Sequence, residues 1–116
     1  MSELKKFNYT TFQDEPLSGT DDWQKVAYLE DPKCDYEWAE FRAFYSPSAR
    51  RYFWHGDSGC SCNGWGDDVS TAASFENGGR ADLLRAWENF TKDHGYYFGV
   101  GEYLSGVAEI RKFKAA

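Results

Sequence analysis

The chain has 116 residues, the size of one domain, and we expect residues 1–116 to fold as a single unit. Its formal net charge of −6 argues against direct nucleic-acid binding, which requires Lys and Arg side chains to neutralise phosphates. No apolar run of about 18 residues occurs, so the sequence predicts no membrane-spanning helix and no membrane partner.

Aromatic residues make up 19% of the chain, so rings must fill much of the core. The negative charge is uneven. Residues 1–68 carry 13 acidic and 7 basic side chains, whereas residues 69–116 carry 6 of each. An acidic first half is compatible with a basic partner protein.

The first 22 residues are polar, with a short aromatic alternation at Phe7, Tyr9 and Phe12. This pattern predicts either an edge strand or a loosely ordered arm over residues 1–22. The Asp-, Ser- and Gly-containing stretch 14–22 predicts a loop.

Three strands are expected next. Residues 23–30 alternate loosely, and residues 36–45 carry the strongest strand pattern in the chain. A turn at 46–49 leads to a returning strand at 50–55, so we expect a hairpin at about 36–56. The face with Ala39, Phe41 and Ala43 is the more apolar one and has room for a helix, although Glu, Ala and Arg also make a helix the rival interpretation of 36–45.

Two helices are predicted in the last third of the chain. Apolar residues recur at helical spacing over 80–93 and again over 100–113. Gly106 lies inside the second segment and indicates close packing there. We therefore expect an α+β fold in which a small antiparallel sheet of three to four strands packs against both helices.

The stretch 54–68 is rich in Gly, Cys, Trp and Asp and predicts a shaped loop at one end of the sheet; we call it the Gly/Cys loop. It offers a recognition surface, since Trp often anchors protein interfaces. The candidate interaction residues are Trp54, Asp57, Ser58, Gly59, Cys60, Ser61, Cys62 and Trp65.

A zinc site is the alternative for the same region. The hairpin would bring Cys34 and His55 toward one end of the sheet, where Cys60 and Cys62 would complete a tetrahedral set. The Cys-x-Cys spacing is not that of the usual zinc fingers. An odd number of cysteines indicates reduced thiols, so the leading expectation is no cofactor.

Catalysis is not predicted. Cys60 with His55 or His94 and Asp57 supplies the residue types of a cysteine nucleophile, but no nucleophile-elbow pattern accompanies them. We therefore assign no catalytic residue and do not expect an enzyme.

The aromatic run Tyr52-Phe53-Trp54, followed by Asp57-Ser58-Gly59-Cys60-Ser61-Cys62, resembles a family of small actinobacteriophage proteins without an assigned activity. That family usually continues into a Pro- and Phe-containing segment, where this chain has Asn63-Gly64-Trp65-Gly66. The resemblance implies a phage origin and the host cytoplasm.

Three functions follow as hypotheses. The leading one is a non-enzymatic phage accessory protein that binds a host or phage protein through an acidic, aromatic surface near the Gly/Cys loop. The second is a zinc-stabilised domain or metal-dependent enzyme. The third is an acidic nucleic-acid mimic that inhibits a DNA-binding protein, which requires aligned surface carboxylates.

Overall fold

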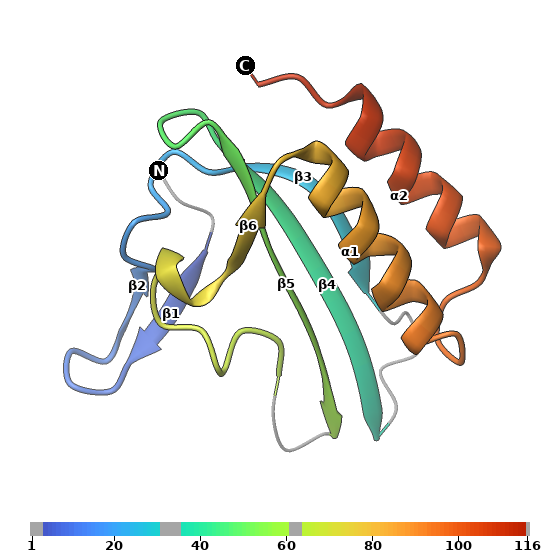
Figure 1. Ribbon diagram of the computed structural model, residues 1–116. Helices are drawn as coiled ribbons and strands as arrows, with labels where there is room; N and C mark the ends of the chain where they lie inside the picture. Colours follow the sequence, from blue (N-terminus) through green and yellow to red (C-terminus); the bar gives the residue numbers. More distant parts are fainter. Residues whose placement is uncertain (1–3, 31–35, 61–63, 116) are drawn as a thin grey trace.

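The computed structural model describes residues 4–30, 36–60 and 64–115, which form an α+β fold and confirm the predicted class (Figure 1). The elements are β1 Lys5–Asn8, β2 Gln13–Pro16, β3 Gln24–Glu30, β4 Glu37–Ser46, β5 Arg51–Cys60, a short 3-10 turn at Ala72–Ser74, β6 Glu76–Gly78, α1 Arg80–Asp93 and α2 Val100–Lys112. No helix among these elements is long and apolar enough to cross a membrane.

Four strands form one antiparallel sheet in the order β3-β4-β5-β6. Its centre is the β4–β5 hairpin, which pairs Glu37 with Cys60 at the open end and Ser46 with Arg51 at the turn. The predicted hairpin is confirmed, but the expected loop begins too early. Residues 57–60 are strand because their backbone pairs with the first residues of β4.

Two further strands were not expected. Residues 13–16, predicted as loop, pair with β1 as a separate two-stranded arm. The side-chain oxygen of Asn8 accepts hydrogen bonds from the amides of Thr10 and Thr11, and Phe12 adopts a φ of 56°, so side-chain bonding closes this turn without a glycine. The short β6 pairs with β5 inside the predicted connecting segment.

Both helices lie on one face of the sheet (Figure 1). α1 has the predicted bounds, and α2 ends one residue earlier than expected. Each begins after a glycine whose amide donates to a carboxylate three residues on: Gly79 to Asp82 at 3.0 Å, and Gly99 to Glu102 at 3.2 Å. Acidic side chains at these helix starts also favour the helix dipole.

The helix-side core lies between the sheet and the two helices. Ala39 and Ala43 are fully buried, and between them the Phe41 ring meets Trp87 edge-on at 5.4 Å. The predicted apolar face of β4 is thus the one that the helices cover, because its small residues leave room for helical side chains.

The arm-side core covers the opposite face near the hairpin turn. Trp23 stacks on Phe53 at 4.6 Å and meets Phe75 edge-on at 4.9 Å, while Phe44 is almost completely buried beside them. Its apolar members are Leu4, Leu17, Trp23, Phe44, Val69 and Phe75. The sheet is therefore covered on both sides at the turn end, whereas polar side chains occupy the arm-side face farther along β4 and β5.

Candidate functional site

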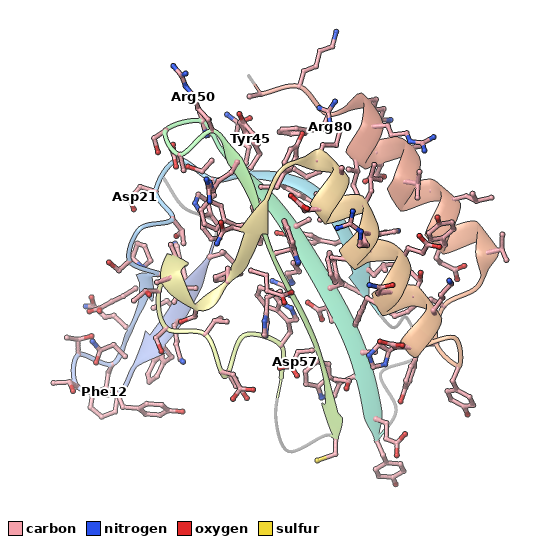
Figure 2. All side chains as sticks on the ribbon, viewed as in Figure 1. Phe12, Asp21, Tyr45, Arg50, Asp57 and Arg80 are labelled. Carbon is pink, nitrogen blue, oxygen red and sulfur yellow. The ribbon has the colours of Figure 1, made fainter. Side chains whose placement is uncertain are left out.

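Two rows of polar side chains cross the sheet on the face opposite the helices. In Figure 2, Asp57 lies toward the open end of the β4–β5 hairpin, away from Arg50 at its turn. The strand register fixes the members of the rows. The first contains Tyr28, Arg42 and His55, and the second contains Glu30, Glu40 and Asp57.

We call Glu30, Glu40 and Asp57 the acidic row. Glu40 is the direct cross-strand partner of both other members, and such Cα partners lie about 4.5–5.5 Å apart. Like charges in this arrangement destabilise a sheet. Burial raises the pKa of the Glu40 carboxyl above its ordinary value, while Arg42 lowers this pKa and Glu30 raises it.

Arg42 connects the acidic row to the Gly/Cys loop. Its Nε donates to the Glu40 carboxylate, and its guanidinium stacks over the Trp65 ring with 4.4 Å to the ring centroid. The Trp65 indole N–H in turn donates to the backbone oxygen of His55 at 2.8 Å. These contacts hold Trp65 against the sheet, so one basic residue orients both a carboxylate and an aromatic ring.

His55 is enclosed by these neighbours. Its ring lies 5.5 Å from Trp65 and 6.0 Å from Phe75, centroid to centroid. Its Nε2 is buried, 3.7 Å from an Asp57 carboxylate oxygen, and has no hydrogen-bond partner among the described residues. The Asp57 carboxylate is therefore an acidic group within 4 Å of this nitrogen.

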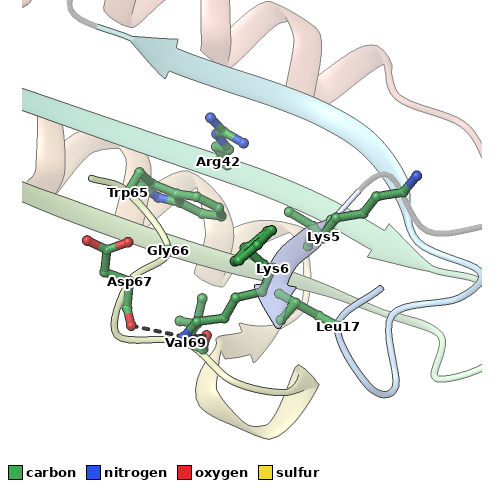
Figure 3. A pocket seen from close by; sticks show the side chains of 10 residues that line it. Lys5, Lys6, Leu17, Arg42, Trp65, Gly66, Asp67 and Val69 are labelled. Atoms are coloured by element: carbon green, nitrogen blue, oxygen red, sulfur yellow. Dashed lines mark hydrogen bonds between the residues drawn. The ribbon is translucent and has the colours of Figure 1, made fainter. Parts of the chain in front are cut away.

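A pocket of about 300 Å³ opens between the arm and residues 65–69, at the end of the Gly/Cys loop (Figure 3). Lys5, Lys6 and Arg42 line it together with Trp65 and Asp67. Lys6 Nζ donates to the backbone oxygens of Asp67 and of Val69, both at 3.1 Å. Through these two hydrogen bonds, Lys6 links the arm to residues 67–69.

The structure separates the predicted interaction residues. Trp54 is only 5% exposed, lies in the helix-side core and donates its indole N–H to Glu76 at 3.0 Å, so it does not belong to a contact surface. Asp57 and Trp65 lie on the arm-side face. Ser58, Gly59 and Cys60 are strand residues at the open end, and Ser61 and Cys62 lie outside the described residues.

The proposed zinc ligands do not come together. His55 and Cys60 lie five residues apart in β5, which places them about 16 Å apart and on opposite faces of the sheet. Zinc ligands bind within about 2.0–2.3 Å of the ion, so these two cannot share it. Cys34 and Cys62 lie outside the described residues, and within the described parts no group of three potential ligands is close enough for one ion.

Cys60 also differs from the expectation of reduced thiols. Its sulfur is in a disulfide bond. A disulfide sulfur provides neither the thiolate that binds zinc nor the thiolate that attacks a substrate. His94 lies at the end of α1, against Phe90 at 4.3 Å, and is part of the helix side of the molecule.

Sequence reasoning missed Glu30, Glu40, Arg42 and Lys6. The positions of Glu40 and Arg42 could have been predicted from the hairpin turn. A turn between Ser46 and Arg51 pairs residue 42 with 55 and residue 40 with 57. Carrying the hairpin beyond residue 56 would have revealed the Glu40–Asp57 pair of the acidic row. The contact made by Lys6 had no local signal, since it joins residues more than 60 positions apart.

The family model described as domain of unknown function (DUF7574) matches residues 10–116, nearly the whole chain. The match covers the sheet, both helices and all three members of the acidic row. No curated protein and no solved structure matches.

Proposed function

We propose that this chain, which belongs to the DUF7574 family, is a small non-enzymatic bacteriophage accessory protein that acts by binding a protein of the phage or its host. The observation that carries the proposal is the acidic row. Three carboxylates stand side by side on neighbouring strands, and the central one, Glu40, is the direct cross-strand partner of both others. Such a row favours contact with a basic surface.

Aromatic side chains border the acidic row and supply contact area. Tyr36 is 84% exposed, and Trp38 is half-buried on the same strand face as Glu40. The Trp38 indole N–H donates to the Cys60 backbone oxygen at 2.8 Å, which holds the ring in one position. A rigid aromatic ring beside charged groups is typical of interface anchors, because little side-chain entropy is lost on binding.

The phage origin rests on the motif at residues 57–62, and the host cytoplasm follows from that origin. Catalysis is not part of the proposal, since His55 and Cys60 lie on opposite faces of the sheet.

The test is affinity capture from an actinobacterial host lysate, with and without phage infection. The variant Glu30→Gln/Glu40→Gln/Asp57→Asn removes the acidic row while keeping side-chain size. We expect it to lose the captured partner and to melt at the same temperature as the wild type or higher, because like-charge repulsion is removed.

The matched control is Asp21→Asn/Asp68→Asn/Asp93→Asn, which changes the net charge equally at three exposed positions outside the row. It should keep the partner. If both triple variants lose the captured partner equally, net charge alone explains the binding. If both variants keep the partner, the acidic row is not part of the binding surface.

A second candidate is an acidic nucleic-acid mimic that occupies a DNA-binding protein. The alignment of three carboxylates across adjacent strands favours it. In that case duplex DNA would release the captured protein competitively, and the released protein would itself bind DNA. Release by salt alone, without competition by DNA, would favour a partner that does not bind nucleic acid.

A further inference from the structure

The outer edge of β3 is open. β3 is the terminal strand of the four-stranded sheet, and no described strand pairs with its outer side. A bulge between Lys25 and Ala27 interrupts its first half, whereas Ala27 to Glu30 follow β4 in regular register. Bulges protect sheet edges from pairing with other chains, so the unprotected part of this edge is its second half.

α2 runs beside this second half and leaves a hollow of about 340 Å³ between helix and strand. Leu29 and Glu30 line it from the strand, Trp87 from α1, and Gly101, Ser105 and Glu109 are among the residues that line it from α2. The small side chains at 101 and 105 keep the helix from filling the space. The result is a groove with a strand edge on one side and a helix on the other.

The charge of the groove is uniform. Glu30, Glu102 and Glu109 all line it, and no lysine, arginine or histidine does so among the described residues. In the part of the chain that the structure describes, none of the three forms an ion pair with a basic side chain. An occupant that complements this lining carries positive charge.

We infer that an extended, Lys- or Arg-bearing segment of a partner protein adds to the outer edge of β3 in this groove. Backbone hydrogen bonds to a free strand edge provide the affinity in this mode of recognition, and alternate side chains provide the specificity. Basic side chains that point to the arm-side face of the added strand meet Glu30, and those that point to the helix side meet Glu109. The inference rests on the proposed function and deepens it, because Glu30 belongs both to the acidic row and to the groove.

The test uses a fluorescein-labelled peptide of sequence Lys-Val-Lys-Lys-Val-Lys, which places lysines on both faces of an added strand, and measures fluorescence anisotropy. We expect saturable binding to the wild-type chain. Methylating alternate backbone nitrogens of the peptide should weaken binding by roughly tenfold or more, because N-methylation removes strand hydrogen bonds and keeps the charge. Hydrogen exchange of the Ala27–Glu30 amides should slow when the unmethylated peptide is present.

Two protein variants address the groove. Ser105→Trp fills it, and Glu109→Lys reverses one of its charges; each should weaken peptide binding by roughly tenfold. The matched control for Glu109→Lys is Asp68→Lys, which makes the same change in net charge at an exposed position at the end of the Gly/Cys loop, outside the groove, and should leave binding unchanged. Because Ser105 and Glu109 are exposed, both groove variants are expected to fold.

The outcomes separate the two proposals. Absence of saturable binding up to about 1 mM peptide, or binding that is insensitive to N-methylation and to both groove variants, would overturn the inference. If the captured lysate protein still depends on Glu40 and Asp57 in that case, the proposed function stands with a partner on the sheet face alone. If the peptide binds the groove and the acidic-row variant still captures its partner, the inference about the groove is supported. In that case the acidic row is not the surface that contacts the partner.

Discussion

Two carboxyl groups on the arm-side half of the molecule respond to their surroundings in opposite directions. Hydrogen bonding by Ser48, and to a smaller degree by Ser46, lowers the pKa of Asp22 in spite of the opposing effect of burial. Burial raises the pKa of Glu40 in spite of Arg42. Asp22 therefore stabilises the fold in its charged form, whereas Glu40 is favoured in the fold when neutral.

The raised pKa of Glu40 predicts a pH dependence of stability. A carboxyl whose pKa is raised by folding stabilises the protein fully below its unfolded value of 4.5, and this contribution is lost as pH rises through the folded pKa. We expect the wild type to lose stability relative to Glu40→Gln between pH 4.5 and neutrality. Urea unfolding at a series of pH values measures the difference.

Asp22 does not affect this comparison, because its contribution to stability is lost only as pH falls below its ordinary pKa of 3.8 toward the lowered pKa of the folded state. A companion variant, Glu30→Gln, should lower the pKa of Glu40 in an NMR titration of the side-chain carboxyl. Parallel stability curves for the wild type and Glu40→Gln above pH 4.5 would contradict the assignment.

At the scale of elements, the contact between the two helices depends on one glycine. A Cβ added at Gly106 of α2 would lie 1.7 Å from Cζ2 of Trp87 on α1, far inside contact distance. The Trp87 indole N–H also donates to the Tyr103 backbone oxygen at 3.1 Å, so the ring cannot move aside without losing this bond. The close packing expected at Gly106 from the sequence is confirmed.

We predict that Gly106→Ala destabilises the protein by about 1–3 kcal/mol, the usual cost of overpacking a filled site, or by more. Gly101→Ala is the matched control in the same helix, because an added Cβ there meets nothing within 4 Å. It should stabilise the helix by about 0.5–1 kcal/mol. Urea midpoints measure both, and a Gly106→Ala variant as stable as the wild type would mean that the helices do not pack in this way.

At the scale of the whole molecule, one sheet is shared by two cores. Residues of β4 alternate between them: Phe41 packs on Trp87 in the helix-side core, and Phe44 packs near Trp23 in the arm-side core. A change in one core therefore alters the strand that supports the other. The arm, the sheet and the helices should unfold together as one cooperative unit.

Phe44→Leu tests this cooperativity. The ring is 1% exposed, and we expect a loss of about 1–2 kcal/mol, less than the roughly 3–5 kcal/mol typical of Phe→Ala. Far-UV circular dichroism of the helices and tryptophan fluorescence should shift to the same new midpoint. A helix transition that stays at the wild-type midpoint would show that the two cores unfold independently.

The local elements of this protein follow from patterns within short stretches of its sequence. The period of apolar residues identified α1 over 80–93 and nearly all of α2, and the alternation around Phe41 identified both the central strand and the face that the helices cover. These features depend on residues a few positions apart, which helical or strand geometry brings to one face. The α+β class followed from the same patterns.

The side chains of the candidate site come together only when distant elements pack against one another. It moved Trp54 into the core, separated His55 from Cys60 and aligned Glu30 with Glu40 across two strands. The register between strands, the docking of the arm and the groove beside β3 depend on contacts between distant parts of the chain. Periodicity within a segment carries no information about such contacts, because they are set by how complete elements pack together.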